Sequence, residues 1–368
     1  SMAELDVAKI NWHIDAGNIS RRYHPEYDYL AILNYTPQCQ YEGNWDDVTM
    51  MCRGLIYDHE NGLLVSRPFP KFFNVQEHEQ KPELGALPEW PPNNVIEKMD
   101  GSLGITYPSP TGVKIATRGS FTSDQAVWAS RFLEGRLDDT ISHNSTLLFE
   151  IVYPENRIVV DYGDYSGLVF LDAVNNSDGS RVFLGEVPQL LQSVGQFDRA
   201  TLWAHDCNIS KLVEERPNTE GVVLVWDQPE GPPIRAKMKS SEYVALHRFV
   251  FGLSSRKVWE LLSDPDLSEE KMNDFMAAVP EEFAPWITKK VIELGEKFDA
   301  IHCKAMQDWA AIKKEIGWGT VDRKEFAELN LANSDNPGLV FSIEDNKELR
   351  KPIWKLIEPD KTDKPERN

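Results

Sequence analysis

The chain has 368 residues, of which 41% are hydrophobic and 27% are charged, and its formal net charge is −20. This composition is typical of a folded protein and excludes an intrinsically disordered one, and the length suits two domains. No apolar run approaches the roughly 20 residues that a membrane-spanning helix needs. The acidic balance argues against broad, non-specific binding to duplex nucleic acid, although it is compatible with a local basic cleft.

Targeting signals and cysteine usage point to the cytoplasm. The N-terminal residues lack the basic start and the apolar centre of a signal peptide. The four cysteines (Cys39, Cys52, Cys207 and Cys303) are far apart and form no C-x-x-C pair. This spacing supports neither a zinc site nor a disulfide framework, so we expect a reducing, cytoplasmic environment and no membrane partner.

Residues 1–240 have the pattern of short strands separated by turns. Each candidate strand is apolar or β-branched and is bounded by Gly, Pro, Asn or Asp. The candidates are 54–58, 62–68, 102–107, 113–119, 146–153, 167–174 and 220–226. One helix is expected at 122–135, with Thr122 or Ser123 as its N-cap.

After Lys239 the pattern changes to apolar residues at three- and four-residue spacing, which predicts helices. Serines stand where N-caps belong, at 240–241, 254–255 and 268. We therefore expect an α+β protein with a β-rich domain over residues 1–245 and an all-α C-terminal domain over residues 246–368.

Several common catalytic patterns are missing from the sequence. It has no Gly-Lys dipeptide and therefore no P-loop, and it lacks G-x-G-x-x-G, G-x-S-x-G and H-E-x-x-H. The eight histidines show no metal-ligand spacing. What remains is a set of lysines and carboxylates at the ends of candidate strands.

The segment EKMDGS, residues 97–102, brings a lysine, a carboxylate, a glycine and a hydroxyl together at a strand end. The amine of Lys98 is a nucleophile only when it is neutral, a form that burial or neighbouring cations would favour. Gly101 allows a tight turn, and Ser102 offers a donor to a phosphate. The alternative is an ordinary strand-end lysine before an Asp-Gly turn, and this segment alone favours that alternative.

Two carboxylates and two lysines farther along the chain are further candidate site residues. Glu150 lies inside the apolar run LLFEIVY, and Glu220 opens the strand EGVVLVW. An unpaired carboxylate in an apolar strand is costly, so Glu150 predicts either a structural ion pair or a functional contact. Lys237 and Lys239 are two residues apart on one strand and share a face. That face is either solvated or directed at a polyanion such as a nucleoside triphosphate.

Together these segments resemble a known superfamily. In chain order, KMDGS, FEIVY, LVFLDAV, EGVVLVW and KMK look like motifs I, III, IIIa, IV and V of the covalent nucleotidyltransferases, which include ATP-dependent DNA and RNA ligases and mRNA capping enzymes. Within the superfamily the chain most resembles the RNA ligase 1 family of bacteriophages, through CRGLIYD, FPKFFN, TRGSF and KMKSSEYVALH. The resemblance covers residues 30–250 and implies an antiparallel β-sheet nucleotidyltransferase domain.

The resemblance implies a role for each matching residue. Lys98 would take AMP from ATP, and Arg53 and Lys71 would hold the triphosphate. Glu150 would hydrogen-bond the ribose. Glu220 would help hold a divalent metal, Mg²⁺ or Mn²⁺.

The other residues implied in catalysis or ATP binding are Asp100, Gly101, Arg118, Lys237, Lys239 and Tyr243. The two lysines would stabilise charge on the α-phosphate, Asp100 would serve the metal or the attacking hydroxyl, and Tyr243 would lie near the nucleotide. Arg118 departs from the family pattern, in which we expect a lysine; the charge is kept, but a planar guanidinium replaces a compact ammonium.

We therefore expect an ATP-dependent RNA ligase that joins RNA 5′-phosphate and 3′-hydroxyl ends through lysyl-AMP. The resemblance implies a monomer that acts in RNA repair, including repair of nicked tRNA, in a bacterial or phage-infected cell. One alternative is another enzyme of the superfamily, a DNA ligase or an mRNA capping guanylyltransferase, but those continue after motif V into a small β-barrel. The other is a non-catalytic nucleotide- or RNA-binding protein, against which the intact motif residues argue.

Overall fold

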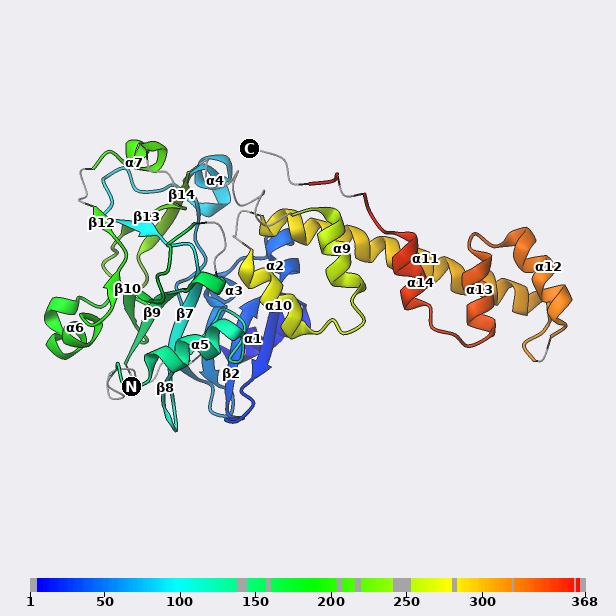
Figure 1. The fold of residues 1–368 in the computed structure, drawn as a ribbon, viewed down its shortest axis with the longest axis horizontal. Coiled ribbons are helices and arrows are strands. Elements are labelled where there is room, and N and C mark those ends of the chain that lie inside the picture. The colour runs from blue at the N-terminus through cyan, green and yellow to red at the C-terminus, as the bar shows by residue number, and fades with distance from the viewer. Residues whose placement is uncertain are drawn as a thin grey trace. The chain divides into compact units, whose positions relative to one another are not determined.

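The structure is a computed structural model, and it describes residues 5–137, 144–156, 160–203, 207–215, 220–240, 253–279, 283–319, 321–360 and 362–364. The chain divides into two compact units, Ser1–Phe251 with Asn273–Glu281 and Gly252–Met272 with Glu282–Asn368. Strands lie in the first unit and helices make up the second (Figure 1), which confirms the predicted α+β class. The domain boundary at 245/246 stays a prediction, because residues 241–252 lie outside the described ranges.

The first sheet has the strand order β1-β2-β3-β4, and every neighbouring pair is antiparallel. Its strands are β1 (Ile19–Tyr23), β2 (Leu30–Tyr35), β3 (Arg53–Asp58) and β4 (Leu63–Ser66). Alternation along β2 directs Ala31 and Leu33 to one face, where they pack with α1 (Val7–Asp15) and α3 (Asp47–Met51). Leu30 and Ile32 point to the opposite face, which packs on the second sheet.

The second sheet has the order β11-β10-β9-β7-β8 and is antiparallel except for the parallel pair β10–β11. Its strands are β7 (Ser102–Ser109), β8 (Gly112–Ala116), β9 (Ser145–Val152), β10 (Gly167–Asn175) and β11 (Asp198–Arg199). Helices α5 (Asp124–Leu133) and α6 (Pro188–Val194) pack on one face. The Ser123 side chain accepts a hydrogen bond from the Ala126 N–H, which confirms Ser123 as the N-cap of α5.

The third sheet has the order β12-β6-β13-β14-β5 and is antiparallel except for the pair β14–β5. Its strands are β5 (Phe73–Asn74), β6 (Asn94–Lys98), β12 (Leu202–Trp203), β13 (Gly221–Trp226) and β14 (Ile234–Lys239). Its outer face packs with α4 (Val75–Gln80) and α7 (Ile209–Glu215). On its inner face, Ile96 and Val225 pack against Val152 and Val169 of the second sheet. These two sheets therefore meet face to face.

Short helices complete the described part of the first unit: α2 (Pro37–Glu42) and the 3-10 turns η1 (Pro82–Leu84), η3 (Pro154–Asn156) and η4 (Leu184–Glu186). The later helices are α9 (Ser255–Ser263), α10 (Glu269–Ala278), α11 (Ala284–Ile316), α12 (Arg323–Asn333), α13 (Pro337–Glu344) and α14 (Arg350–Leu356). Ser254 and Ser268 accept hydrogen bonds from the N–H groups of Lys257 and Lys271, so both predicted N-caps are confirmed. The N-cap expected at 240–241 stays a prediction, because residues 241–252, where its helix would lie, are outside the described ranges.

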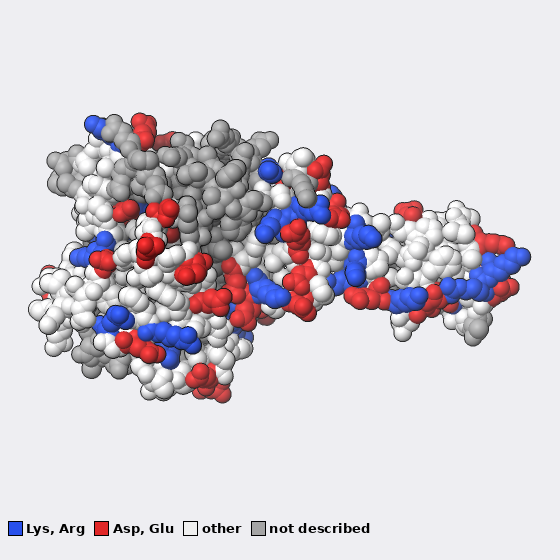
Figure 2. Space-filling view, viewed as in Figure 1, with Lys and Arg blue, Asp and Glu red and all other residues white. Residues whose placement is uncertain are grey.

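Basic and acidic side chains alternate along one edge of the helical unit (Figure 2). Within α11 the ion pairs include Lys304–Asp308 at 2.8 Å and Lys290–Glu293 at 3.2 Å. These pairs have the i,i+4 and i,i+3 spacing that places two side chains next to each other on a helix. Among the described residues, no helix combines the length and the apolar character that a membrane span requires.

Candidate active site

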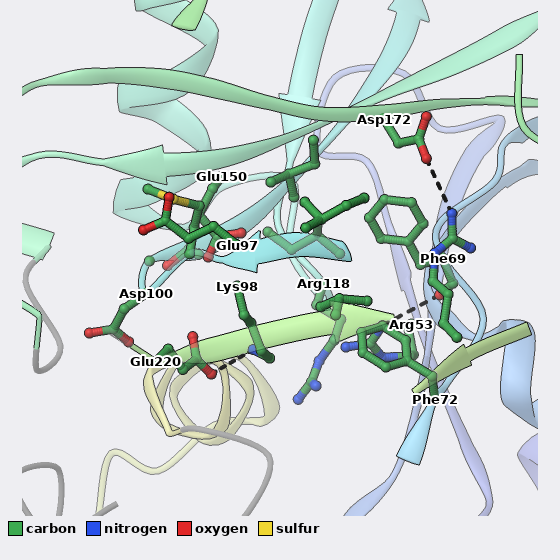
Figure 3. A pocket seen from close by; sticks show the side chains of 18 of the residues that line it. Arg53, Phe69, Phe72, Glu97, Lys98, Asp100, Arg118, Glu150, Asp172 and Glu220 are labelled. Carbon is green, nitrogen blue, oxygen red and sulfur yellow. Dashed lines mark hydrogen bonds and ion pairs between the residues drawn. The ribbon is translucent and has the colours of Figure 1, made fainter. Parts of the chain in front are cut away.

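A pocket lies between the second and third sheets, with walls from β3, β6, β7, β9, β10, β13 and β14. The predicted site residues that line it are Arg53, Lys98, Asp100, Gly101, Arg118, Glu150 and Glu220. Figure 3 shows Lys98 pointing at Glu220 from one wall, with Arg53 and Arg118 on the same side of the pocket as Phe72. Residues as far apart in the sequence as Arg53 and Glu220 thus meet at one place, although Lys71, Lys237 and Lys239 are not among the lining residues.

Lys98 and Glu220 form the central ion pair of the pocket. Lys98 ends β6, and its register partner on β13 is Gly221, the residue that follows Glu220. The Lys98 Nζ donates to Glu220 Oε1 at 2.5 Å, and the two side chains are 21% and 4% exposed. Both charges are therefore largely removed from water, where the loss of one partner is costly to the other.

Glu150 lies on β9 and points into the same pocket, because alternation places it on the strand face of Leu148 and Val152. Burial raises the pKa of Glu150 to about 8, and the nearby carboxylates of Glu220 and Asp100 act in the same direction, while Lys98 opposes the shift. At neutral pH the protonated carboxyl is therefore well populated, and that form can donate as well as accept a hydrogen bond.

Asp100 and Gly101 shape the turn after Lys98. The Asp100 Oδ2 accepts a hydrogen bond from the Val160 N–H at 2.6 Å, and the Asp100 N–H donates to the Tyr162 hydroxyl at 2.9 Å. A Cβ on Gly101 would lie 2.4 Å from the carbonyl oxygen of Ile151. The glycine is therefore required for close approach to β9, and Asp100 ties the turn to the segment after residue 159.

Arg53 and Lys237 meet on one aromatic ring. The Arg53 guanidinium carbon is 5.6 Å from the centroid of Phe72, and the Lys237 Nζ is 5.8 Å from the same centroid. An Arg53 Nη1–H also donates to the Phe69 carbonyl at 3.5 Å. Because an aromatic face attracts a cation without neutralising it, Phe72 brings two positive charges together at the pocket edge.

Lys71 and Arg118 share a second ring. The Lys71 Nζ lies 5.0 Å from the Phe73 centroid, 5.4 Å from Trp45 and 5.7 Å from Tyr35. The Arg118 guanidinium carbon is 5.4 Å from Tyr35, and its Nη1–H donates to the Tyr35 hydroxyl at 3.3 Å. Tyr35 thus connects Lys71 to a cation that lines the pocket.

Lys239 ends β14 opposite Gly221, so it is two strands away from Lys98 at the same level of the sheet. Gly221 has φ +144°, and a Cβ there would meet the Met238 carbonyl at 2.1 Å. The glycine after Glu220 is thus required for the close pairing of β13 with β14. Tyr243, which was also predicted for the site, lies outside the described residues.

Among the lining residues that the sequence interpretation missed is a charged pair, Asp172 on β10 and Arg235 on β14. They form an ion pair at 3.4 Å, and Asp172 is also paired with Arg181 at 2.7 Å. Burial lowers the pKa of Arg235 to about 10, which still leaves it charged at neutral pH. The signal was present in RAKMK, where Arg235 continues the two-residue spacing of Lys237 and Lys239.

The chain is similar to proteins of known sequence and structure. The sequence model described as RNA ligase matches residues 51–251. The chain is 22% identical over 354 residues to an RNA ligase of Rhodothermus phage RM378, covering 78% of this chain and 77% of that protein. It is 23% identical over 303 residues to RNA ligase 1 of bacteriophage TS2126, covering 73% and 71%. Among solved structures, an RNA ligase of Naegleria gruberi with ATP and manganese has a TM-score of 0.38 at 14% identity, over 50% of this chain and 59% of that one.

Proposed function

The chain belongs to the RNA ligase family, and we propose that it joins an RNA 5′-phosphate to an RNA 3′-hydroxyl through AMP carried on Lys98. The observation that carries this proposal is the Lys98 amine, which lies in a pocket between two sheets, paired with a buried carboxylate and next to clustered cations. Partial burial and neighbouring cations favour the neutral amine that a covalent nucleophile needs, once the carboxylate has released it.

In the first step, the Lys98 Nζ attacks the α-phosphorus of ATP. A nitrogen–phosphorus bond forms, the bond from that phosphorus to the bridging oxygen breaks, and pyrophosphate leaves. The amine must lose a proton before it attacks, and the ion pair with Glu220 keeps that proton in place. Glu220 therefore has to release the ammonium, which then gives its proton to solvent water before the amine attacks.

Cations at the pocket edge suit the triphosphate. Arg53 and Lys237 on Phe72, and Lys71 and Arg118 on Tyr35, gather positive charge where the β- and γ-phosphates would extend from Lys98. Such charges orient pyrophosphate as leaving group and stabilise the phosphate oxygens in the transition state. Lys239 would act on the α-phosphate, since it is level with Lys98 in the sheet.

A divalent cation, Mg²⁺ or Mn²⁺, fits the oxygen donors of the pocket. Among the described residues, no three His, Cys, Asp or Glu side chains form a ready metal cluster. Mg²⁺ commonly uses only one or two carboxylates and takes its other ligands from substrate phosphates and water. Glu220 would be the carboxylate that holds the cation, and the cation would supply positive charge to the phosphates.

Glu150 would hydrogen-bond the ribose of the nucleotide. Its carboxyl is inside the pocket and is largely protonated at neutral pH, so it can donate to one sugar oxygen and accept from a hydroxyl. Gly101 brings the turn close enough to β9 for Lys98 and Glu150 to face the same ligand.

In the later steps the AMP moves to the RNA. An oxygen of the RNA 5′-phosphate attacks the AMP phosphorus, the bond to Lys98 breaks, and the amine is restored. The RNA 3′-hydroxyl then attacks the activated 5′-phosphorus, and AMP leaves. Asp100, at the turn beside Lys98, would interact with the attacking 3′-hydroxyl in this last step. RNA repair, including resealing of a nicked tRNA, is the use that the family resemblance suggests, and a nicked tRNA is the substrate to offer.

The test is a Lys98→Arg variant, because arginine keeps a cation beside Glu220 but stays protonated at any accessible pH. With α-labelled ATP and Mg²⁺, the wild-type protein should carry label through a denaturing gel, and Lys98→Arg should carry none. Lys114→Arg on β8 is the matched control and should label normally. Lys98→Arg should still join pre-adenylylated RNA without ATP, since the amine is not needed in the last step. Labelling of Lys98→Arg would refute the assignment.

A further inference from the structure

Arg235 shares one face of β14 with Lys237 and Lys239, directed at the second sheet. The intervening Ala236 packs on the opposite face, in the outer core of the third sheet. Lys239 is level with Lys98, whereas Arg235 is four residues farther along β14, opposite Val225. It therefore lines the pocket away from the nucleophile.

The neighbours of Arg235 cancel its charge. Its Nη2 pairs with Asp172 at 3.4 Å, and Asp172 pairs with Arg181 at 2.7 Å, which in turn lies 3.5 Å from Asp227. Two arginines and two aspartates make up this cluster, so their formal charges sum to zero. The end of the pocket near Asp172 (Figure 3) is consequently suited to an uncharged group, unlike the cationic edge around Arg53.

One donor of Arg235 is left for a ligand. The residue is 7% exposed, and its Nη1 is buried with no hydrogen-bond partner among the residues that the structure describes. A buried donor without an acceptor costs free energy, and arginine side chains in this position normally have partners. The guanidinium stacks on Phe69, with its carbon 4.2 Å from the ring centroid, so its orientation is restricted.

The pocket wall between Lys98 and Arg235 is apolar. Ile96 of β6 and Val223 of β13 line it from one sheet, and Leu171 of β10 lines it from the other. A flat aromatic ring fits between two such surfaces, and its polar edge would then need a partner at the far end.

We propose that Arg235 determines nucleotide specificity by donating a hydrogen bond from Nη1 to a ring nitrogen on the edge of adenine. This inference rests on the proposed function, because it places the base of the ATP that reacts with Lys98. Asp172 acts through Arg235 as a positioning residue, since it holds the other arm of the guanidinium.

The experiment compares ATP with 1-deaza-, 3-deaza- and 7-deaza-ATP in the rate of enzyme adenylylation. In wild-type protein, the analogue that lacks the acceptor of Arg235 should show a KM about tenfold above that of ATP, as expected for one hydrogen bond from a charged donor. In Arg235→Met, the KM for ATP should rise to the same level, and that analogue and ATP should become equivalent. The limiting rate should change little, because the reacting phosphorus is untouched.

Arg181→Met is the matched control. Arg181 shares the Asp172 carboxylate but is not among the residues that line the pocket, so its loss should leave the discrimination between ATP and the analogue intact. Arg235→Lys repeats the test with a cation kept beside Asp172, in case the methionine variant does not fold. A purely structural role would raise the KM for ATP and all three analogues by the same factor in Arg235→Met, which would overturn the proposal.

Three further outcomes also decide the matter. If the discrimination that Arg235 confers concerns 2′- or 3′-deoxy-ATP instead, the residue binds the sugar and the base assignment is wrong. If wild-type protein takes no label from ATP, the proposed function itself fails. Labelling by ATP with equal use of every deaza analogue would refute only the role of Arg235.

Discussion

Removing Lys98 should destabilise the protein as well as abolish its adenylylation, and the two effects can be separated. Lys98→Ala leaves Glu220, whose side chain is only 4% exposed, without its 2.5 Å partner. Loss of one member of a buried pair costs about 3–5 kcal/mol, and the 21% exposure of Lys98 places this pair near the lower end, at about 3 kcal/mol. Adding Glu220→Gln removes the stranded charge and should recover about 2 kcal/mol of the free energy of unfolding.

Urea unfolding at pH 7, followed by fluorescence and circular dichroism, measures both values. Lys114→Ala on β8 is the control for loss of a strand lysine and should cost less than about 1 kcal/mol. A loss below about 1 kcal/mol in Lys98→Ala, or no recovery in the double variant, would show that water screens the pair. In that case the desolvated ion pair could not be what holds the proton on the nucleophile.

Three further predictions concern the pocket and the elements around it. The pKa of Glu150 is raised to about 8 from its ordinary 4.5, so between these two pH values the folded state keeps a proton that the unfolded state has released. The free energy of unfolding should therefore fall as pH rises from 4.5 to about 8, by up to about 1.4 kcal/mol per pH unit. Urea unfolding of Glu150→Gln should lack this pH dependence. Gly221→Ala puts a Cβ 2.1 Å from a β14 carbonyl at φ +144° and should cost more than about 2 kcal/mol in the same assay, whereas Gly185→Ala, which meets nothing within 4 Å, should be nearly neutral. Tyr35→Leu removes the ring shared by two cations and should raise the KM for ATP about tenfold in adenylylation while sparing the joining of pre-adenylylated RNA; an equal effect on both steps would contradict this reasoning.

Much of the fold follows from local pattern. Ser123, Ser254 and Ser268 cap helices where apolar periodicity begins, and the short strands bounded by turn residues form the sheets. The change after Lys239 to apolar residues at three- and four-residue spacing predicts the helices of the second unit. Local pattern does not predict that β10 pairs in parallel with β11 or β14 with β5, because each pairing depends on which distant segments meet.

The candidate site was predictable where chemistry and strand alternation coincide. Lys98 at a strand end, Glu150 in an apolar run and the spacing of Lys237 and Lys239 are all visible in sequence. The contact between Lys98 and Glu220 spans 122 positions, so only the family resemblance brought them together before the fold was known. Their functional roles remain predictions that the variants above test.

Aromatic partners were the harder part to predict. Nothing near Lys71 in the sequence shows that Tyr35 and Trp45 will lie within 6 Å of its amine. The rings come from β2 and from the segment before α3, which approach the lysine only when the first sheet packs on the rest of the unit. Cages of this kind depend on tertiary packing and leave no periodic signal.

These rings also explain how a chain of net charge −20 can offer a site to a triphosphate. A carboxylate placed beside each cation would hold it in position but cancel its field, whereas a ring holds the cation and leaves the field in place. Phe72 and Tyr35 each contact two cations, so four positively charged side chains lie against uncharged rings. At the other end of the pocket, carboxylates pair with Arg235 and Arg181 and cancel their charges. One pocket thus separates a part suited to phosphates from a part suited to an uncharged base, and overall composition reveals neither.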